Sequence, residues 1–362
     1  MKIGILTFHC AHNYGAVLQC YATQEFLRSK GYEVEVINYR PQYLLEPYKL
    51  FNRKRIICKN LIRLLKRLAI EVLIFSNRYK RFKGFERFIH NRLQIRDAVT
   101  RDTLPSDCDA YIIGSDQVWN SRITQGFDPI YFADFPFEKG NKKYISYAAS
   151  MESKTLILEQ VDFYAKSIKN FDFLSVREIQ LQQLLQPLTS KKISQVLDPT
   201  LMVPTHLWDN LSSDKSNVEK YVVVYQVRVD PNTMRIAEYI ANQIGAKVKV
   251  LVAWLQYKAV EGTDQTATPE DFVDAIRNAA CVVTTSFHGT AFSVIFNRPF
   301  YTIKLNDGWD SRSESLLGTL NLEKRVVEVN ASPIFSDIDY SLVNQKLEQL
   351  RSESQEFLLN SL

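Results

Sequence analysis

The chain of 362 residues contains 45 Lys and Arg against 40 Asp and Glu, and 46% of its residues are hydrophobic. This length predicts two domains, and the ordinary apolar fraction excludes a disordered or low-complexity chain. The net charge of +5 does not by itself indicate a nucleic-acid binder, and we expect no nucleic-acid partner.

In the first half of the chain, short apolar runs alternate with helical patterns, as in βα units. The spacing predicts a helix over 16–30 and short strands over 3–8, 33–38, 110–113, 144–148, 174–176 and 195–197. Most of these strands are continuous apolar runs followed by small or polar residues. This pattern is typical of buried parallel strands, whose carboxyl ends gather ligands.

A hydrophilic segment at 209–219 separates this series from a second one. We expect strands over 221–227, 248–252, 281–285 and 300–303, and helices over 233–244, 269–279 and 288–296. The predicted organisation is an N-terminal Rossmann-like domain over 1–208 and a C-terminal one over 220–340. A closing helix over 341–362 is expected to pack back on the N-terminal domain.

The opening residues 1–8 contain too few apolar residues for the core of a signal peptide and are better explained as a strand. No run of 18 apolar residues occurs, so we expect a cytoplasmic protein without a membrane span. The five cysteines form no CxxC pair and have no histidine at zinc spacing, so neither a disulfide framework nor a metal site is predicted.

The loop over 9–19 joins the first strand to the first helix. Gly15 lets the backbone approach a ligand, and the free N–H groups of a helix start attract anions. The loop matches neither GxGxxG nor GxxxxGK[ST], so it carries no nucleotide-binding fingerprint. The competing interpretation is an ordinary strand–helix turn in which His9 and His12 are structural polar residues.

Two further strand ends carry charged side chains. Arg177 follows the strand at 174–176, and its parallel donors suit a carboxylate or a phosphate. The alternative for Arg177 is an interdomain salt bridge. Asp116 follows the strand at 110–113 as a candidate general base or sugar-orienting carboxylate, and Trp119 offers an apolar face to a sugar ring. The alternative for Asp116 is a cap on the next turn.

The strand at 281–285 ends in hydroxyl side chains and leads directly into the next helix. His288 is therefore expected at a helix start, where an imidazole can transfer protons or pair with a phosphate. Because Ser286 and Gly289 flank it, we favour a functional histidine over a structural one.

Taken together, these segments resemble the polysaccharide pyruvyl transferase family. The similarity runs from Lys2 to about Arg325 and rests on five motifs in order: 13–16 with Gln19, 114–120, 175–178, 197–200 and 286–293. Each motif is weak alone, whereas five at plausible separations are fairly specific. The resemblance implies a fold of two Rossmann-like domains facing a cleft, like that of the GT-B glycosyltransferases.

The resemblance also implies a reaction. The pyruvyl group of phosphoenolpyruvate would move onto two hydroxyls of one sugar, giving a 4,6-ketal on galactose or an N-acetylhexosamine of a capsular or exopolysaccharide and releasing phosphate. No cofactor beyond this co-substrate is implied. The donor-binding basic residues of the family correspond to Arg177 and His288. From the residue types we expect His288 to be the acid that protonates C3 or assists phosphate departure, and Asp116 to be the base or the sugar-orienting carboxylate.

The remaining site residues are assigned in the same way. Many family members have Arg where this chain has Ser286, so a further donor contact is expected from Lys304 or Arg312. Donor-side candidates are Arg177, Ser286, Phe287, His288, Gly289, Lys304 and Arg312, and acceptor-side or loop candidates are Asn13, Tyr14, Gly15, Gln19, Ser115, Trp119 and Asp198.

Residues 49–101 form a strongly basic insert on the acceptor side of the predicted cleft. They include 16 basic and three acidic residues and so carry +13, which leaves −8 on the rest of the chain. Apolar residues recur from Ile57 at helical spacing, with Lys59, Arg63, Lys66 and Arg67 towards the other side. Two interpretations stay open. The insert contacts the inner face of the cytoplasmic membrane, where a polyprenyl-pyrophosphate-linked acceptor would lie, or its apolar face packs on the first domain.

Two other functions compete with pyruvyl transfer. A GT-B glycosyltransferase using a nucleotide-sugar could be built on the same scaffold, because a fold does not fix a function. A non-catalytic glycan- or lipid-binding relative is the third interpretation, which Ser286 keeps open.

Overall fold

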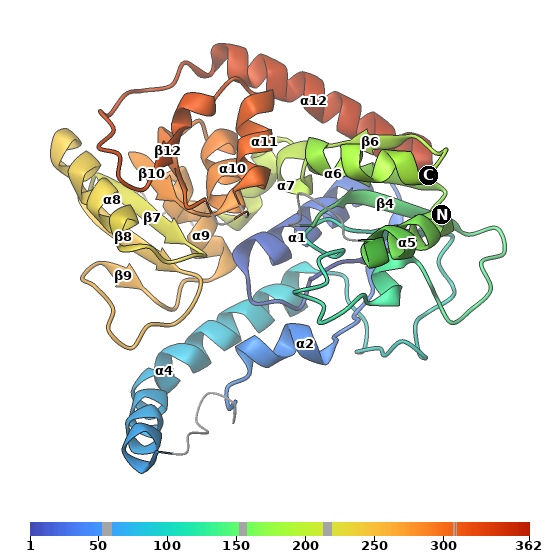
Figure 1. The fold of residues 1–362 in the computed structure, drawn as a ribbon, viewed down its shortest axis with the longest axis horizontal. Coiled ribbons are helices and arrows are strands. Elements are labelled where there is room, and N and C mark those ends of the chain that lie inside the picture. Colours follow the sequence, from blue (N-terminus) through green and yellow to red (C-terminus); the bar gives the residue numbers. More distant parts are fainter. Residues whose placement is uncertain (53–59, 152–157, 213–218, 307, 309) are drawn as a thin grey trace.

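The computed structural model describes the chain apart from residues 53–59, 152–157, 213–218, 307 and 309. Two parallel six-stranded sheets, each flanked by helices, form two Rossmann-like domains side by side (Figure 1). The predicted fold class is therefore confirmed. Lys59 and the start of the predicted insert helix at Ile57 lie outside the described residues.

The first sheet has the strand order β2-β1-β3-β4-β5-β6. Its strands are β1 (Lys2–Leu6), β2 (Glu33–Val36), β3 (Ala110–Ile113), β4 (Lys143–Ala149), β5 (Phe173–Val176) and β6 (Ile193–Gln195). Strand β6 begins two residues before the predicted position because Ile193, which is buried, pairs with Leu174. The helices of this half are α1 (Tyr14–Ser29), α2 (Gln42–Leu45), α4 (Leu61–Arg92), α5 (Leu158–Ser167), α6 (Ile179–Leu185) and α7 (Pro199–Met202).

The second sheet has the order β12-β11-β10-β7-β8-β9, which is the Rossmann arrangement. Its strands are β7 (Tyr221–Gln226), β8 (Lys247–Val252), β9 (Thr263–Asp264), β10 (Cys281–Thr284), β11 (Phe300–Lys304) and β12 (Val326–Glu328). Its helices are α8 (Pro231–Ile244), α9 (Pro269–Arg277), α10 (Phe287–Ile295) and α11 (Ser311–Thr319). The order of the strands reverses between β1 and β3 in the first sheet and between β7 and β10 in the second, and both points are favoured ligand sites.

Local sequence explains where the helices that face the domain boundary begin. Thr268 and Asp271 form a capping box at the start of α9. Asn13 caps α1 by accepting from the N–H of Ala16, and Ser286 caps α10 by accepting from the N–H of Gly289. The starts of α1 and α10 are thereby fixed at the two switch points.

The two domains share one hydrophobic core. Tyr14 at the start of α1 stacks on Phe272 of α9 with ring centroids 4.7 Å apart, and Phe85 of α4 stacks on Tyr14 from another side. The Tyr14 hydroxyl donates to the Ala267 carbonyl and accepts from Arg81 of α4. Aromatic side chains of the first half therefore pack directly into the second.

The last helix, α12 (Tyr340–Ser361), crosses the top of both domains in Figure 1. At its start the Tyr340 hydroxyl donates to the Arg298 carbonyl of the second half. Farther along, Ser354 accepts from the N–H of Leu197 and Arg351 donates to the Leu201 carbonyl, both in the first half. The expected return of the closing helix to the first domain is confirmed.

Candidate active site

A cavity of about 450 Å³ lies where the carboxyl ends of the two sheets face each other, and we call it the central cavity. The loop after β1, the loop after β3 and the start of α10 each contribute to its wall. Its charged and aromatic lining comprises Phe8, Tyr43, Tyr48, Asp116, Arg122, Arg228, Trp254, Phe287, His288 and Arg312. Among these lining residues, three arginines and a histidine face a single carboxylate, so the cavity suits an anionic ligand.

Arg312 and Arg228 provide positive charge on the side of the second domain. Burial, with the nearby charge of Arg177, lowers the pKa of Arg312 to about 10. An anion bound beside a buried guanidinium with a second guanidinium nearby would stabilise its charged form. Arg228 is held in place by hydrogen bonds to Asp310 Oδ1 at 2.8 Å and to the Thr285 carbonyl at 3.0 Å.

Asp198 is the centre of a buried network next to this cavity. Its Oδ2 lies 2.6 Å from Arg177 Nη1, 3.1 Å from Ser115 Oγ and 3.6 Å from His288 Nε2. Its Oδ1 accepts from the N–H and the hydroxyl of Thr200, because Asp198 is also the N-cap of α7. Burial alone would raise the pKa of Asp198, but His288 and Arg177 hold it well below its usual range.

The network brings Arg177 and His288 together, as the sequence analysis expects. However, both side chains lie against Asp198, whereas the sequence analysis expects both to contact the donor. The Asp198 carboxylate occupies the space between the two side chains that had been assigned to the donor. Arg177 also pairs with Glu178 at 3.2 Å, and its guanidinium lies 4.6 Å from the centre of the Phe287 ring. Arg177 is therefore a buried member of an ion-pair network and does not line the central cavity.

His288 is fixed from two sides at the start of α10. A Cβ atom added to Gly15 would come within 1.9 Å of His288 Nδ1, so the histidine ring packs directly against the backbone of α1. Asp198 faces the other ring nitrogen, Nε2. A buried carboxylate that orients an imidazole is a common arrangement for acid–base work. Gly15 is thus needed because of the histidine and not because of a bound ligand.

Several sequence-based assignments are wrong in their details. Trp119 is only 1% exposed, stacks on Phe132 and donates from Nε1 to the Tyr131 carbonyl, so no sugar can reach its face. Lys304 pairs with Glu314 at 2.7 Å and does not line the central cavity. Tyr14 is buried between the domains, as described above.

The remaining candidates divide between the wall and the interior. Asn13, Asp116, Ser286, Phe287 and Arg312 line the central cavity. Asp116 has a left-handed backbone (φ 59°) and its Oδ1 accepts from the N–H of Gln117, so both the functional and the turn interpretation apply to it. Gln19 and Ser115 are fully buried, and Gly289 fits tightly because its Cβ would lie 2.3 Å from Thr284 Oγ1.

Six of the charged and aromatic lining residues were not predicted from the sequence: Phe8, Tyr43, Tyr48, Arg122, Arg228 and Trp254. Arg228 lies two residues after β7, and Trp254 lies two residues after β8. Both could therefore have been found by the rule that pointed to Arg177, which is that ligands gather at the carboxyl ends of parallel strands. Tyr48 directly precedes the basic insert, and its ring stacks on that of Trp254 with centroids 5.4 Å apart and planes 6° apart. This pair joins the two domains across the cleft.

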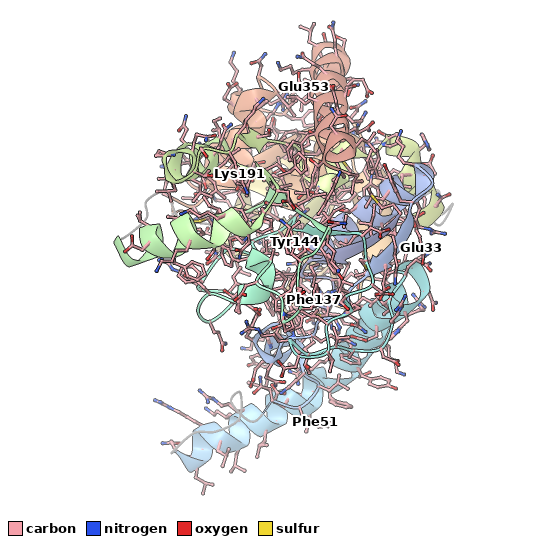
Figure 2. All side chains as sticks on the ribbon, turned by 90° about the vertical axis from the view of Figure 1, so that its right-hand side faces the viewer. Glu33, Phe51, Phe137, Tyr144, Lys191 and Glu353 are labelled. Carbon is pink, nitrogen blue, oxygen red and sulfur yellow. The ribbon has the colours of Figure 1, made fainter. Side chains whose placement is uncertain are left out.

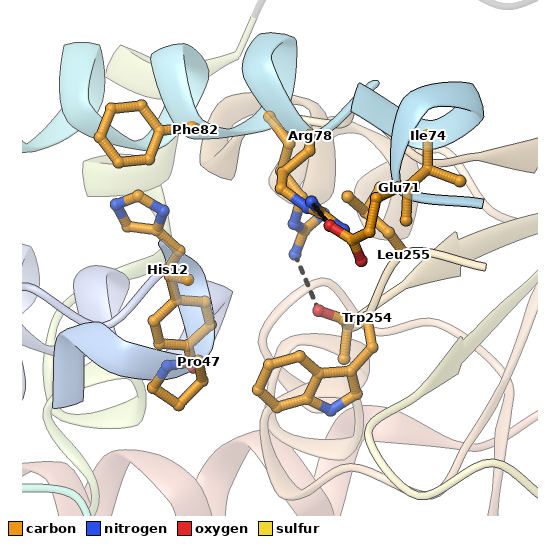
Figure 3. Close-up of a pocket in the computed structure, with 11 residues that line it drawn as sticks. His12, Pro47, Glu71, Ile74, Arg78, Phe82, Trp254 and Leu255 are labelled. Atoms are coloured by element: carbon orange, nitrogen blue, oxygen red, sulfur yellow. Dashed lines mark hydrogen bonds and ion pairs between the residues drawn. The ribbon is translucent and has the colours of Figure 1, made fainter. Parts of the chain in front are cut away.

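A second cavity, of about 390 Å³, lies beyond this aromatic pair (Figure 3). Pro47, Tyr48 and Trp254 line both cavities, while His12, Arg78 and Phe82 line only the second. Figure 3 shows His12 between Phe82 and Pro47, with Arg78 joined to Glu71 on the other side. The cleft therefore continues from the central cavity towards α4.

Glu86 of α4 ties the first loop to the wall of this second cavity. It accepts from His12 Nε2 at 2.9 Å and from Arg40 Nη2 at 2.7 Å. Burial alone would raise the pKa of Glu86, but the hydrogen bond from His12 and the charge of Arg40 lower it to about 2. Burial lowers the pKa of His12 itself, which leaves Arg40 as the permanent cation of the cluster.

One group of described residues could in principle hold a metal ion: Glu35, Asp107 and Cys108. Lys2 and Arg96 already pair with both carboxylates of this group. The group surrounds the start of β1 and so lies at the edge of the sheet opposite the central cavity.

The two facing Rossmann-like domains, with one cavity between their carboxyl edges and a helix crossing back, define a GT-B-type protein. The solved structures to which the chain is similar include UDP-GlcNAc 2-epimerase from Methanocaldococcus jannaschii in complex with UDP-GlcNAc and UDP (11% identity, 99% of each chain, TM-score 0.48). The glycosyltransferase SnogD from Streptomyces nogalater is similar over 99% of this chain and 95% of its own (11% identity, TM-score 0.40).

The family model for polysaccharide pyruvyl transferase matches residues 13–307, and the chain belongs to this family. The match covers the start of α1, the Asp198 network and the start of α10, while Arg312 lies just beyond it. No curated protein matches the chain. Within the described residues no helix is both long enough and apolar enough to cross a bilayer.

Proposed function

We propose that the protein transfers the pyruvyl group of phosphoenolpyruvate to two hydroxyls of one sugar in a glycan, forming a cyclic ketal and releasing phosphate. Membership of the family supports a transferase acting in polysaccharide biosynthesis. The observation that supports phosphoenolpyruvate as the donor is the positive charge of the central cavity. Arg122, Arg228 and Arg312 line it together with one carboxylate, that of Asp116. Phosphoenolpyruvate has a carboxylate and a phosphate, and guanidinium groups bind both.

In this proposal the donor is bound by Arg312 and Arg228 rather than by Arg177. Arg177 keeps a positioning role, because its ion pair with Asp198 fixes the carboxylate that faces His288. The first N–H groups of α10 add a helix terminus next to the bound anion. Ser286, which stands where many family members have Arg, caps that helix, and Arg312 supplies the missing cation.

The reaction follows from an acid and a base that face the same cavity. His288 gives a proton to C3 of the enol while the oxygen of the first sugar hydroxyl bonds to C2, and Asp116 takes the proton of that hydroxyl. The bond between C2 and the phosphate oxygen then breaks, and phosphate leaves with the bonding electron pair. The second hydroxyl attacks C2 and gives its proton to His288, which closes the ketal and restores the acid, and Asp116 passes the proton that it took to the departing phosphate. The acceptor we propose is galactose or an N-acetylhexosamine, bridged between its 4- and 6-hydroxyls.

Thermal unfolding with added ligands tests the donor. We expect phosphoenolpyruvate to raise the melting temperature and UDP or GDP to have no effect, because a ligand that binds only the native state stabilises it. Arg312→Gln should abolish the stabilisation by phosphoenolpyruvate. Lys304→Gln is the matched control, since Lys304 pairs with Glu314 away from the cavity and should leave the stabilisation intact. Stabilisation by a nucleoside diphosphate instead would favour the nucleotide-sugar glycosyltransferase.

The transfer itself is tested by incubation with phosphoenolpyruvate and candidate galactosides or N-acetylhexosamine lipids. The proposal requires that free phosphate and the mass of a pyruvyl ketal on the acceptor appear together. Phosphate release without a change in the acceptor would contradict it.

A further inference from the structure

The amino-terminal half of α4 projects away from both domains, as Figures 1 and 2 show from two directions. The carboxyl-terminal half of the same helix is wedged between the domains, where Arg81 donates to the Ala253 carbonyl and Gly84 packs against Thr268. The buried residues of α4 begin only at Ile74. One rigid helix of 32 residues therefore connects the cleft to a protruding arm.

The protruding half of α4 exposes large apolar side chains that no described part of the chain covers. We call them the apolar ridge of α4: Leu61 (69% exposed), Ile62 (66%), Leu65 (58%), Leu68 (40%), Val72 (75%) and Leu73 (71%). Single exposed apolar residues are ordinary, but a contiguous group of this size indicates an interaction surface. The packing of this face on the first domain, one of the two interpretations from the sequence, is wrong for the ridge.

The charges on the first part of this helix, residues 61–70, have one sign. Arg63, Lys66 and Arg67 lie on the side away from the stripe formed by Leu61, Leu65, Leu68 and Val72. The first acidic residue of the helix is Glu71, and it accepts from Arg78. The arm thus combines an apolar face with a basic face, the composition of helices that lie in the interface of an anionic membrane.

The spacing of the stripe, four and three residues in alternation, would also fit a seam with a second copy of α4. Two observations favour a lipid surface. Ile62 and Leu73 lie beside the stripe, and a two-helix seam would leave them in water, whereas a membrane interface covers a wider face. Residues 61–70 of a second copy would bring only further cations to Arg63 and Lys66, whereas anionic headgroups would neutralise them.

From these contacts and charges we propose that the apolar ridge of α4 and its three cations dock the protein on an anionic phospholipid surface. Docking by the arm would hold the wedged half of α4, and with it the second cavity, close to the membrane. Acceptors assembled on membrane lipids would then be within reach of the cleft. The docking itself does not depend on which reaction the central cavity performs.

Sedimentation with vesicles tests this proposal. The full chain should pellet with vesicles of phosphatidylglycerol and phosphatidylcholine and stay in solution with phosphatidylcholine alone. The triple variant Arg63→Gln, Lys66→Gln, Arg67→Gln should bind about a hundredfold more weakly, because each cation near an anionic surface contributes a factor of about five. The triple variant Lys30→Gln, Lys192→Gln, Lys324→Gln is the matched control, because these lysines are exposed on other elements, and it should bind like the parent.

A second pair of variants tests the apolar contribution. Leu61→Ser with Leu65→Ser should abolish pelleting, whereas Ile334→Ser with Leu342→Ser, which removes two exposed apolar side chains elsewhere, should not. Unchanged melting temperatures would show that each variant is folded. Equal binding to both kinds of vesicle, or binding to neither, would overturn the proposal. So would a parent dimer in solution that the Leu61 and Leu65 substitutions convert to a monomer, since the ridge would then be a seam between copies.

Discussion

Replacing Gly15 by Ala places a methyl group where the His288 ring now lies. The new Cβ would be 1.9 Å from Nδ1 and 2.3 Å from two ring carbons, whereas ordinary contacts begin at 3.4 Å. The histidine must therefore move by about 1.5 Å, away from its position beside Asp198. A displacement of this size at a reacting group lowers a rate by about a hundredfold, and overpacking of the site costs about 1–3 kcal/mol of stability.

The assay for Gly15→Ala compares kcat for phosphate release in the presence of an acceptor with the melting temperature of the same preparation. Gly318→Ala is the matched control, because the nearest atom to an added Cβ lies 4.0 Å away and Gly318 is inside a helix. This control should keep its kcat and gain up to about 1 kcal/mol of stability. If Gly15→Ala loses stability but retains kcat within a factor of two, the contact with His288 has no part in the reaction and our reasoning is refuted.

Three further substitutions separate stability from function. Glu86→Gln should lower the free energy of unfolding by up to about 3 kcal/mol at neutral pH, because the folded pKa of Glu86, about 2, lies below the reference value of 4.5. In denaturant titrations the parent should lose this extra stability as the pH falls from 4.5 to 2. An equal difference between parent and variant at every pH would contradict the ion pair. Asp198→Asn should lower kcat at least a hundredfold, and phosphoenolpyruvate should still raise the melting temperature of the variant. An unchanged kcat would show that Asp198 does not position His288 for the reaction. Trp254 lines both cavities beside Tyr48, and we expect the acceptor to pack against this aromatic pair. Trp254→Ala should therefore raise KM for the acceptor without changing the donor response, and an effect on the donor alone would contradict this expectation.

The fold could be predicted from the sequence because the signals that define it are local. A continuous apolar run such as 281–284 depends only on neighbouring residues, and the strand occurs where it is expected. The error at β6 has a different origin. Val196 and Leu197 are as apolar as the residues of the strand, but they lead into α7, which Asp198 caps.

The site was predicted only in part because its geometry depends on long-range partners. The rule that ligands gather at the carboxyl ends of parallel strands correctly places Asp116 and His288 on the wall of the central cavity. It cannot show that a carboxylate from a third segment, Asp198, fills the space between Arg177 and His288. It also cannot show that Trp119 is turned into the core while Trp254 faces the cleft.

The helices α4 and α12 both cross from one domain to the other, on opposite sides of the cleft (Figure 1). Because α4 contacts Ala253 and α12 contacts Leu197 and Leu201, the domains are braced at two separate places. A wide hinge opening would have to break one brace completely. Entry of a glycan and exit of its product are therefore expected to use smaller movements around the stacked rings of Tyr48 and Trp254. These local movements, rather than a wide opening of the two domains, would then set the rate of turnover.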